Sequence, residues 1–452
     1  MKKMYRSFLA LTAVLLLGFV LTACGDELAN DPVTPEPPVA AEPAPAPVPE
    51  PEPEGYDPVE ISVWWWGGDH RHQLTTEAIE LFQERYPHIT VNFDFAGWAD
   101  YWTMLTTAAA GNGLPTVMQM DLTRLTEFTV NNLIVPLNPF FADGTIDVSN
   151  VDMASHNGML NIDGDYMAIS LGANAFAMVY NTELAAELGL EFGPDLTWDE
   201  FADMMRGAKA EREDFYGFAF GAAIYELLNI YVRDAGYAMY GDGELGAPRE
   251  VLVDFFTMVQ ELEDEGLVLT IEREAALTEG QSVLHHEIVI SQLFASNQIV
   301  HQQNAYVEAE LGLALLPRIA GGRGGNWIRS SMQFAITSQA TPEEQAAGAK
   351  FINFWTNDLE VNEILNAERG APISDVVRNH LAPLVDPVVR RTFDILPVVA
   401  EHASPADRIS PAEQAAVRSY VDRASEALRM GEMTPEEAAD FVIEGAEDAF
   451  GW

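Results

Sequence analysis

The sequence has very little cysteine and few basic residues, and both shortages exclude classes of protein. Its 452 residues include one cysteine, Cys24, so no disulfide can form within the chain and no cysteine-based zinc or iron–sulfur site can be built. Lys and Arg number 24 against 70 Asp and Glu, which gives a formal net charge of −46. Nucleic-acid binding needs a basic surface, so we expect no nucleic-acid partner. The acidity also opposes direct attraction to an anionic membrane.

Familiar catalytic motifs are missing as well. The sequence contains no His-Glu-x-x-His, no Gly-x-Ser-x-Gly and no P-loop. Carboxylates are abundant, however, so an extracellular glycan-processing hydrolase with a pair of acidic residues stays as an alternative. The pairs His70 and His72, and His285 and His286 beside Glu287, leave a metal-binding protein as a second alternative. Our main expectation is a protein that is not an enzyme and holds no cofactor and no metal.

Long hydrophobic runs are rare, and the one at the N-terminus is short. A basic start, 1–6, precedes the apolar run 8–20, which is too short for a comfortable transmembrane helix and has the layout of a secretory signal. The run ends in Leu21-Thr22-Ala23-Cys24-Gly25, which resembles a bacterial lipobox. We therefore predict a lipoprotein signal peptide at 1–23 and a lipid on Cys24, rather than an ordinary signal peptide with an incidental cysteine. Such a protein is anchored at the extracellular face of the cytoplasmic membrane.

Residues 24–58 read as a linker. Proline and glutamate alternate over Pro49–Glu54, and Pro35-Glu36-Pro37-Pro38 has the same composition. Proline favours extended polyproline II structure and the glutamates repel one another, so the segment is expected to be a semi-rigid spacer.

The folded part is expected to begin near Val59 with alternating strands and helices. The strand 59–66 ends in Trp64-Trp65-Trp66 and breaks at Gly67-Gly68. The segments that follow are a helix at 74–85, a strand at 89–93, a helix at 100–110 and a strand at 115–120. This order predicts a parallel sheet with right-handed crossovers. Further strands are expected at 166–169, 175–180, 217–221, 311–317 and 331–336, with helices beginning after Thr197 and Thr341.

Five local patterns in this order resemble one protein family. They are 61–68 with 77–87, 98–102 with 113–117 and Asp121, 163–169 with 179–181, 196–201, and 347–355 with 369–373. Together, behind a lipobox, they resemble the extracellular solute-binding proteins of bacterial ABC importers, specifically the large carbohydrate-binding family that includes maltose-binding protein.

The resemblance implies an α/β, two-lobed, periplasmic-binding-protein-like fold. Each lobe is expected to be a parallel-rich sheet flanked by helices, with the ligand cleft between the lobes. We assign 59–172 plus 330–368 to the N-terminal lobe and 173–329 plus 369–452 to the C-terminal lobe. The chain is expected to cross between them near 171–174, 327–331 and 369–372. The implied partners are a sugar or oligosaccharide and the membrane subunits of an ABC permease, and we expect the protein to be a monomer.

The first wall of the site is expected at the ends of the first strands. Ligands of open α/β sheets bind beyond the carboxyl ends of the strands. Sugars pack their C–H faces on aromatic rings and need hydrogen-bonding groups for their hydroxyls. Side chains alternate across a strand, so we expect Trp64 and Trp65 in the core and Trp66 in the cleft. The expected ligand-binding residues of this wall are Trp66, Asp69, Arg71, Trp98 and Asp121; capping of a helix is the alternative role for Asp69 and Asp121.

The opposite wall is expected from the crossings and the second lobe. The candidates are Asn174 at the first crossing, Tyr225 in a loop-like stretch, Trp327 at the second crossing and Arg369 at the third. The aromatic content and the negative charge favour a neutral oligosaccharide. An acidic sugar held by Arg71, Arg329 or Arg369 is the main alternative, followed by a polyol or a glycerol phosphate.

Overall fold

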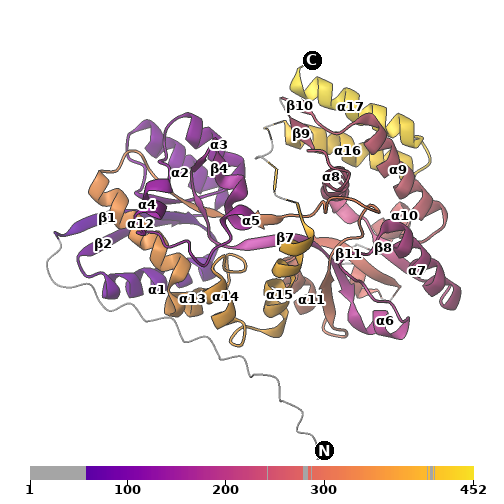
Figure 1. The fold of residues 1–452 in the computed structure, drawn as a ribbon, viewed down its shortest axis with the longest axis horizontal. Coiled ribbons are helices and arrows are strands. Elements are labelled where there is room, and N and C mark those ends of the chain that lie inside the picture. Colours follow the sequence, from indigo (N-terminus) through magenta and orange to yellow (C-terminus); the bar gives the residue numbers. More distant parts are fainter. Residues whose placement is uncertain are drawn as a thin grey trace, which may run out of the picture. The chain divides into compact units, whose positions relative to one another are not determined.

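The protein folds around two β-sheets, each with its own hydrophobic core and its own helices (Figure 1). The computed structural model describes residues 57–241, 243–277, 283–286, 288–404, 406–407, 411 and 413–451, all of which belong to one compact unit, 48–452. The predicted signal peptide, Cys24 and nearly all of the predicted linker lie outside the described residues. Within the described part, no helix is long and apolar enough to cross a membrane.

The first sheet confirms the alternating strands and helices predicted from the sequence. Its strand order is β2-β1-β3-β14-β6, with bounds Ile89–Ala96, Val59–Trp66, Val117–Met120, Gln333–Ile336 and Ile169–Ser170. Strand β1 pairs in parallel with β2 and β3, whereas β14 runs antiparallel to β3 and β6. The carboxyl ends of β1, β2 and β3 therefore lie at one edge of the sheet.

The tryptophans of β1 point to two different cores. Ile61, Val63 and Trp65 are at most 1% exposed and pack in one core with helices α1 (Asp69–Arg85), α12 (Pro342–Asn357) and α13 (Leu359–Leu365). Trp66 lies in the core on the other face, and the half-buried Trp64 packs against that core, which also includes side chains of α2 (Trp98–Ala110) and α3 (Leu122–Val130). The period of two along a strand produces this division.

Helix α1 begins earlier than the sequence pattern predicted. It starts at Asp69, directly after Gly67-Gly68, and not near Leu74. Asp69 in the first turn is favourable because the helix dipole is positive there. Gly67 allows the tight turn, since a Cβ at this position would lie 2.6 Å from Cδ of Arg71.

The second sheet has strand order β12-β7-β11-β8, and β13 pairs with the first part of β7. The bounds are Leu311–Ala314, Ala173–Asn181, Val289–Ala295, Tyr216–Ala219 and, for β13, Ile328–Ser330. Strand β7 runs antiparallel to β11, β12 and β13, and only β11 and β8 are parallel. The expectation of a parallel-rich sheet is wrong for this lobe. Strand β7 arrives from the crossing without a helix before it, so the rule that makes β-α-β strands parallel does not apply to it.

Helices α7 (Trp198–Glu211), α8 (Ile224–Asp234), α9 (Arg249–Asp264), α16 (Gln414–Arg429) and α17 (Pro435–Phe450) contribute to the hydrophobic core of the second sheet. The helix start predicted after Thr197 is confirmed, and a capping box forms there: the Thr197 hydroxyl accepts from the Glu200 N–H, and the Glu200 carboxylate accepts from the Thr197 N–H. The predicted helix start after Thr341 is confirmed with the same arrangement at α12. These caps satisfy N–H groups that the helix itself leaves unpaired.

The three predicted crossings lie side by side. Arg329 pairs with Asn174 between β13 and β7, and the Leu171 N–H donates to the Met332 carbonyl at 2.8 Å. At the third crossing the Ala173 N–H donates to the Ala371 carbonyl at 2.7 Å. Gly172 makes this close approach possible, because a Cβ there would collide with the Arg369 carbonyl group.

In the C-terminal part of the chain, the change from the first core to the second lies beyond the lobe boundary that we assigned between residues 368 and 369. Helices α14 (Asp375–Leu381) and α15 (Pro387–His402) place side chains in the core of the first sheet. The next buried residue that belongs to the core of the second sheet is Val417. The exact lobe boundaries stay a prediction.

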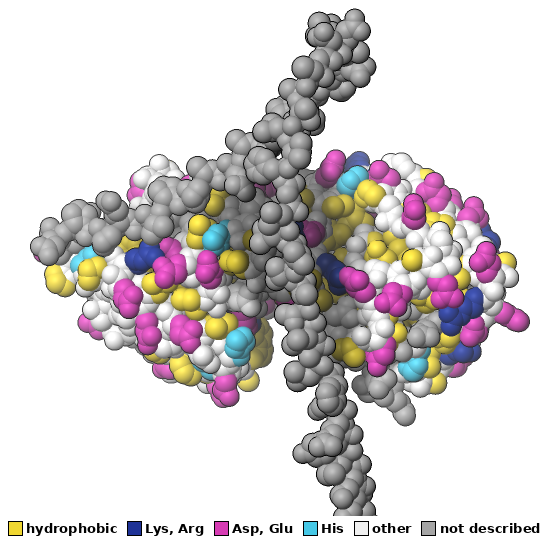
Figure 2. Space-filling model, turned by 90° about the horizontal axis from the view of Figure 1, so that it is seen from below, with side chains coloured by type: hydrophobic (Ala, Val, Ile, Leu, Met, Phe, Trp, Pro, Cys, Tyr) yellow, Lys and Arg dark blue, Asp and Glu magenta, His cyan; other side chains and the backbone are white. Residues whose placement is uncertain are grey.

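The acidic residues do not gather in one place on the visible surface. On the face that Figure 2 shows, Asp and Glu side chains are spread widely, and Lys and Arg are sparse. On this face, therefore, no single acidic patch accounts for the negative charge.

The buried His156 should make the fold sensitive to acid. It lies in α5 (Met153–Asn157), is 5% exposed, and its Nδ1 has no hydrogen-bond partner among the described residues. Burial, helped by Arg378, lowers the pKa of His156 from 6.5 to about 4, against Asp152 and Asp375, which raise it. The lowered pKa means that protonation favours the unfolded chain. The contribution of His156 is therefore present above pH 6.5 and is lost as the pH falls toward 4.

We expect His156→Gln to lose less stability than the wild type between pH 7.5 and pH 4.5. The difference in the free energy of unfolding should be about 2–3 kcal/mol, from about 1.4 kcal/mol for each unit of pKa shift. Urea unfolding at both pH values measures it. His301→Gln, a change at an exposed position of α11 (Gln298–Ala305), is the control and should follow the wild type. Parallel losses in His156→Gln and the wild type would contradict the prediction.

Candidate functional site

A cavity of about 640 Å³ lies beside the β7–β13 pairing, which is a suitable size for a small-molecule ligand. Its walls come from the crossing strands, the end of β11, and helices α8 and α16. The lining residues are Asn174, Phe176, Ala223, Glu226, Gln292, Leu293, Phe294, Ala295, Asn297, Gln298, Arg329, Ser330, Ser331, Met332 and Arg418. Aromatic rings, amides and charged groups are thus combined in one cavity.

Arg329 and Asn174 form the floor of this cavity nearest the crossings. They are directly opposite each other in the antiparallel pairing, so their side chains share a face of the sheet. The Arg329 guanidinium stacks on Phe176, with Cζ 4.8 Å from the ring centroid, and Trp327 packs edge-on against Phe176 at 5.7 Å. Asn174 is 8% exposed, and its Oδ1 has no hydrogen-bond partner in the described part of the chain.

Glu226 and Arg418 form a side wall from two helices far apart in the sequence. Arg418 Nη1 and Nη2 donate to Glu226 Oε1 and Oε2 at 2.5 and 2.9 Å. The guanidinium also lies over the ring of Tyr225, with Cζ 5.3 Å from its centroid. Two-point pairing holds both side chains in place, and each charge is largely matched by the other.

Tyr225 and Trp327, two predicted ligand-binding residues, do not line the cavity. The prediction that Tyr225 lies in a loop is wrong: it is in α8, is 1% exposed, and its hydroxyl is 2.8 Å from that of Tyr240. The apolar residues near Tyr225 in the sequence are spaced as in a buried helix. Trp327 is 8% exposed and packs between Phe176 and the guanidinium of Arg233. Both residues support groups that line the cavity.

In the first lobe, Trp98 offers more surface than Trp66. Trp66 is 8% exposed and packs edge-on against Trp98, with ring centroids 5.0 Å apart. Trp98 precedes the helix predicted at 100–110, but in the structure it is the first residue of α2 and is 49% exposed. Both residues lie at the carboxyl ends of strands: Trp66 is the last residue of β1, and Trp98 comes shortly after β2. The aromatic surface at this edge of the sheet is therefore mainly that of Trp98.

Asp121 takes the capping role that the sequence left as an alternative. Its carboxylate accepts from the Thr123 N–H at 2.9 Å and from the Thr123 hydroxyl at 2.6 Å, at the start of α3. It also lies close enough to Arg329 to affect it electrostatically. Burial lowers the pKa of the Arg329 guanidinium, and the carboxylates of Glu226 and Asp121 oppose that effect.

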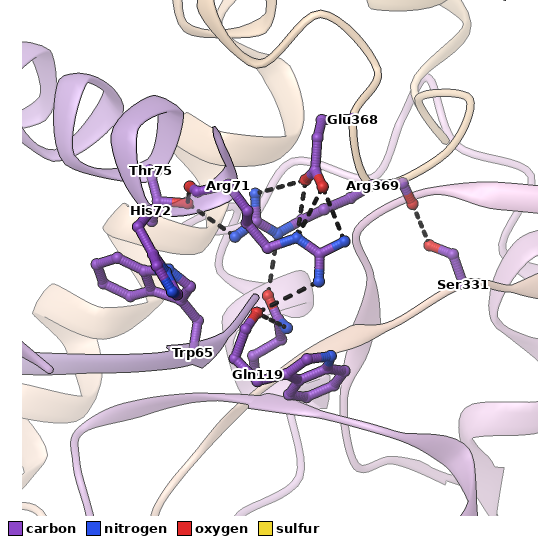
Figure 3. A network of polar contacts seen from close by, with 9 residues as sticks. Trp65, Arg71, His72, Thr75, Gln119, Ser331, Glu368 and Arg369 are labelled. Atoms are coloured by element: carbon purple, nitrogen blue, oxygen red, sulfur yellow. Dashed lines mark hydrogen bonds and ion pairs between the residues drawn. The ribbon is translucent and has the colours of Figure 1, made fainter. Parts of the chain in front are cut away.

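Arg71 and Arg369 belong to a polar network inside the first lobe, shown in Figure 3. Arg71 Nε donates to both carboxylate oxygens of Glu368 at 2.8 and 2.9 Å. Arg369 is 4% exposed; it donates to Gln119 Oε1 at 3.0 Å and to Thr75 Oγ1 at 2.8 Å. The network connects α1, β3 and the third crossing.

Neither of these arginines lines the cavity, and Asp69, the exposed first residue of α1, does not line it either. A ligand-binding role for Asp69, Arg71 and Arg369 stays a prediction. The structure places in the cavity Asn174 and also Arg329, which was considered as an anchor for an acidic sugar. Sequence reasoning missed Phe176, Glu226 and Arg418 as site residues. Glu226 and Arg418 look like ordinary charged positions on helices, and only the fold brings them together.

Among the described residues, no group of three or more His, Cys, Asp or Glu side chains could hold a metal ion. His70 and His72 are described, whereas Glu287 and the side chain of His285 lie outside the described residues.

The chain was compared with protein families and with curated proteins. Residues 77–385 match the model of the bacterial extracellular solute-binding protein family. A protein of Brucella abortus that is described as a binding protein is 23% identical over 260 residues, which cover 56% of this chain and 61% of that protein. The chain thus spans less than two thirds of the length of this curated relative.

Solved structures share the fold over a larger part of the chain. An extracellular solute-binding protein of Alicyclobacillus acidocaldarius has a TM-score of 0.79 at 22% identity, covering 88% of this chain and 100% of that one. A periplasmic oligogalacturonide-binding protein of Yersinia enterocolitica has a TM-score of 0.74 at 21% identity, covering 87% and 99%. The two-lobed fold is therefore that of solute-binding proteins.

The Arg369 network should contribute strongly to stability. We expect Arg369→Met to lower the free energy of unfolding by about 3 kcal/mol or more, because the buried Gln119 Oε1 loses its donor and Thr75 Oγ1 loses one of its two hydrogen bonds. Arg124→Met removes an exposed ion pair to Glu127 (3.1 Å) and should cost less than about 1 kcal/mol. Denaturant unfolding of both variants measures the difference. Equal small losses would show that the network contributes little.

Proposed function

Because the chain belongs to the bacterial extracellular solute-binding protein family, we propose that it is the ligand-capturing subunit of an ABC importer, which delivers a sugar or oligosaccharide to a membrane permease. The observation that carries this proposal is the cavity at the crossing strands. It combines the stacked Phe176 and Arg329 with Asn174, whose buried Oδ1 has no partner among the described residues. A buried acceptor of this kind is costly unless a ligand hydroxyl donates to it.

The composition of the cavity supports a saccharide. Phe176 and Phe294 supply apolar surface, and Asn174, Asn297 and Gln298 supply amide groups. Saccharide ligands need both kinds of group, since their rings have apolar faces and polar edges. One solved structure with the same fold is named for binding an oligogalacturonide, which is consistent with this ligand class.

We further propose that the second wall comes from the first lobe on closure. Trp98, Trp66 and Asp121 lie at the carboxyl ends of three neighbouring strands, and Asp121 is within electrostatic range of Arg329. Rotation of the lobes about the three crossings would bring this edge over the cavity, as in other proteins that close on a ligand. The expected partners are the ligand and the permease, with the protein acting as a monomer.

The hydrolase alternative has less support. Of the described residues that line the cavity, Glu226 is the one carboxylate, and it is paired with Arg418. Glycoside hydrolysis generally needs two carboxyl groups at a set separation. No cysteine is among the described residues that line the cavity.

A saccharide that binds the folded protein should raise its thermal stability and be recovered intact. At a concentration of 100 times Kd, binding stabilises the folded state by about 2.7 kcal/mol. A thermal-shift screen against a saccharide library, followed by mass spectrometry of the ligand, tests both points. If no saccharide shifts the transition at millimolar concentration, the ligand class is wrong. Released hydrolysis products would instead favour the hydrolase.

Trp98→Ala should weaken binding of any saccharide found in that screen by about tenfold, as expected for the loss of one stacking aromatic ring worth about 1 kcal/mol or slightly more. Phe93→Ala is the matched control. Phe93 is 41% exposed, compared with 49% for Trp98, but it lies mid-strand in β2 and packs near Trp65. Titration calorimetry gives the two affinities. Equal effects of the two changes would remove Trp98 from the proposed second wall.

We also propose that Cys24 carries the lipid that holds the protein at the extracellular face of the membrane. The support is the lipobox-like sequence that ends the short apolar run. In a bacterial host fed an alkyne-labelled fatty acid, the wild type should become labelled and stay with the membrane. Cys24→Ser should be unlabelled. Equal labelling of both proteins would place the lipid elsewhere.

A further inference from the structure

The cavity contains a cation that the described part of the chain does not neutralise. The Arg329 guanidinium has five N–H donors but makes no ion pair and no hydrogen bond to any described residue. It stacks on Phe176. Burial of the guanidinium disfavours its charged form, which lowers its pKa. A charge that is partly removed from water and not paired is costly, and a bound anion would offset that cost.

The other arginines considered for the site are already occupied. Arg418 is paired at two points with Glu226, and Arg71 is paired at two points with Glu368. Arg369 is buried and donates to Gln119 and Thr75. Arg329 is therefore the guanidinium of this set that remains available to a ligand.

Arg329 has an acceptor as its neighbour. Asn174 is directly opposite on β7, and its buried Oδ1 has no partner among the described residues. The two side chains thus present N–H donors and a carbonyl oxygen next to each other on one face of the sheet. The complementary ligand has an anionic group with a hydroxyl group beside it. A uronic acid has this arrangement, since its C5 carboxylate is adjacent to the hydroxyl on C4.

We propose that Arg329 binds the carboxylate of a uronic acid residue, so that the transported ligand is an acidic saccharide; this rests on the proposed function. The guanidinium holds the carboxylate through two parallel N–H···O bonds, and the neighbouring hydroxyl donates to Asn174. This assignment replaces the neutral oligosaccharide that the overall acidity favoured, because one local cation outweighs a general field that solvent screens.

A carboxylate fits better than a phosphate. Glu226 and Asp121 are both close enough to act electrostatically on Arg329. Glu226 is already balanced by Arg418, so a phosphate monoester, with nearly two negative charges at neutral pH, would meet Arg329 as the one unpaired guanidinium of this set and the Asp121 carboxylate nearby. A carboxylate carries one negative charge, which Arg329 matches.

The competing role for Arg329 is an ion pair that holds the closed lobes together, which we call a latch. Asp121 is held at the start of α3 in the first lobe and could pair with Arg329 when the lobes close. In that case Arg329 would serve every ligand equally, and Asp121 would be needed as much as Arg329. The variants Arg329→Gln and Asp121→Asn therefore distinguish the two roles.

Titration calorimetry with matched saccharides tests the proposal. The probes are the disaccharides of galacturonate, glucuronate and mannuronate, their methyl esters, the corresponding neutral disaccharides, and galactose 1-phosphate. For the wild type we expect at least one uronate to bind, and its methyl ester to bind at least tenfold more weakly. Arg329→Gln should weaken the uronate about 100-fold and leave the ester nearly unchanged. Arg329→Lys should retain part of the affinity, since it keeps the charge without the two-point geometry.

The matched control is Arg206→Gln, at an exposed ion-paired position of α7 outside the cavity, which should leave uronate binding unchanged. Asp121→Asn, in the proposed second wall, should not weaken the uronate more than its methyl ester, because it removes a negative charge near Arg329. A melting temperature within two degrees of the wild type, measured for each variant, shows that the fold is intact. An equal loss of uronate and ester affinity in Arg329→Gln, or an equal loss in Asp121→Asn, would favour the latch and overturn the proposal.

The remaining outcomes separate this proposal from the proposed function. If neutral disaccharides bind and uronates do not, Arg329 is not a carboxylate anchor, while the saccharide-binding function stands. If the sugar phosphate binds and uronates do not, the ligand class is wrong. If none of these probes and no member of the saccharide library binds, both the proposal and the proposed function fail.

Discussion

Strand β7 belongs to two parts of the molecule at once, the crossings between the lobes and the second sheet. The elements around it depend on this double role. Its first residues are hydrogen-bonded to the second and third crossings, and its remainder is the central strand of the second sheet. Along Ala173–Val179 every residue is buried. The strand therefore has no solvent-facing side over this length, and each side chain faces either a core or the cavity. That constraint explains why small residues, Ala173, Ala175 and Ala177, alternate with larger or polar ones.

Much of the fold could be predicted from the sequence because its signals are local. The strands β1, β2 and β3, the helix starts after Thr197 and Thr341, and the three crossings follow from periodicity, capping residues and the family resemblance. The start of α1 at Asp69 was missed because the polar segment 69–73 shows no apolar period. The antiparallel direction of β7 was missed for a different reason. It depends on the crossing that precedes the strand, and no residue pattern within the strand reveals it.

The site was harder to predict than the fold. Asn174 and Arg329 are near a predicted crossing, so the sequence could point to them. Glu226 and Arg418 are separated by 192 positions and meet only because α8 and α16 pack in one core. The arginines show the same limit. Arg71, Arg329 and Arg369 looked equivalent as possible anchors, and only the partners that surround each of them in the fold distinguish a structural guanidinium from an available one.

The pairing of Arg329 with Asn174 has a mechanical consequence. The two residues lie on the strands that connect the lobes, close to the axis about which the lobes would rotate. Points on a rotation axis are not displaced, so the spacing between the guanidinium and the amide stays the same whether the protein is open or closed. A one-residue slip of β13 against β7 would turn Arg329 to the opposite face, and the hydrogen bond from Leu171 to Met332 and the pair between Ala173 and Ala371 oppose such a slip. The proposed contact of a ligand with Arg329 and Asn174 would therefore not require the lobes to move first.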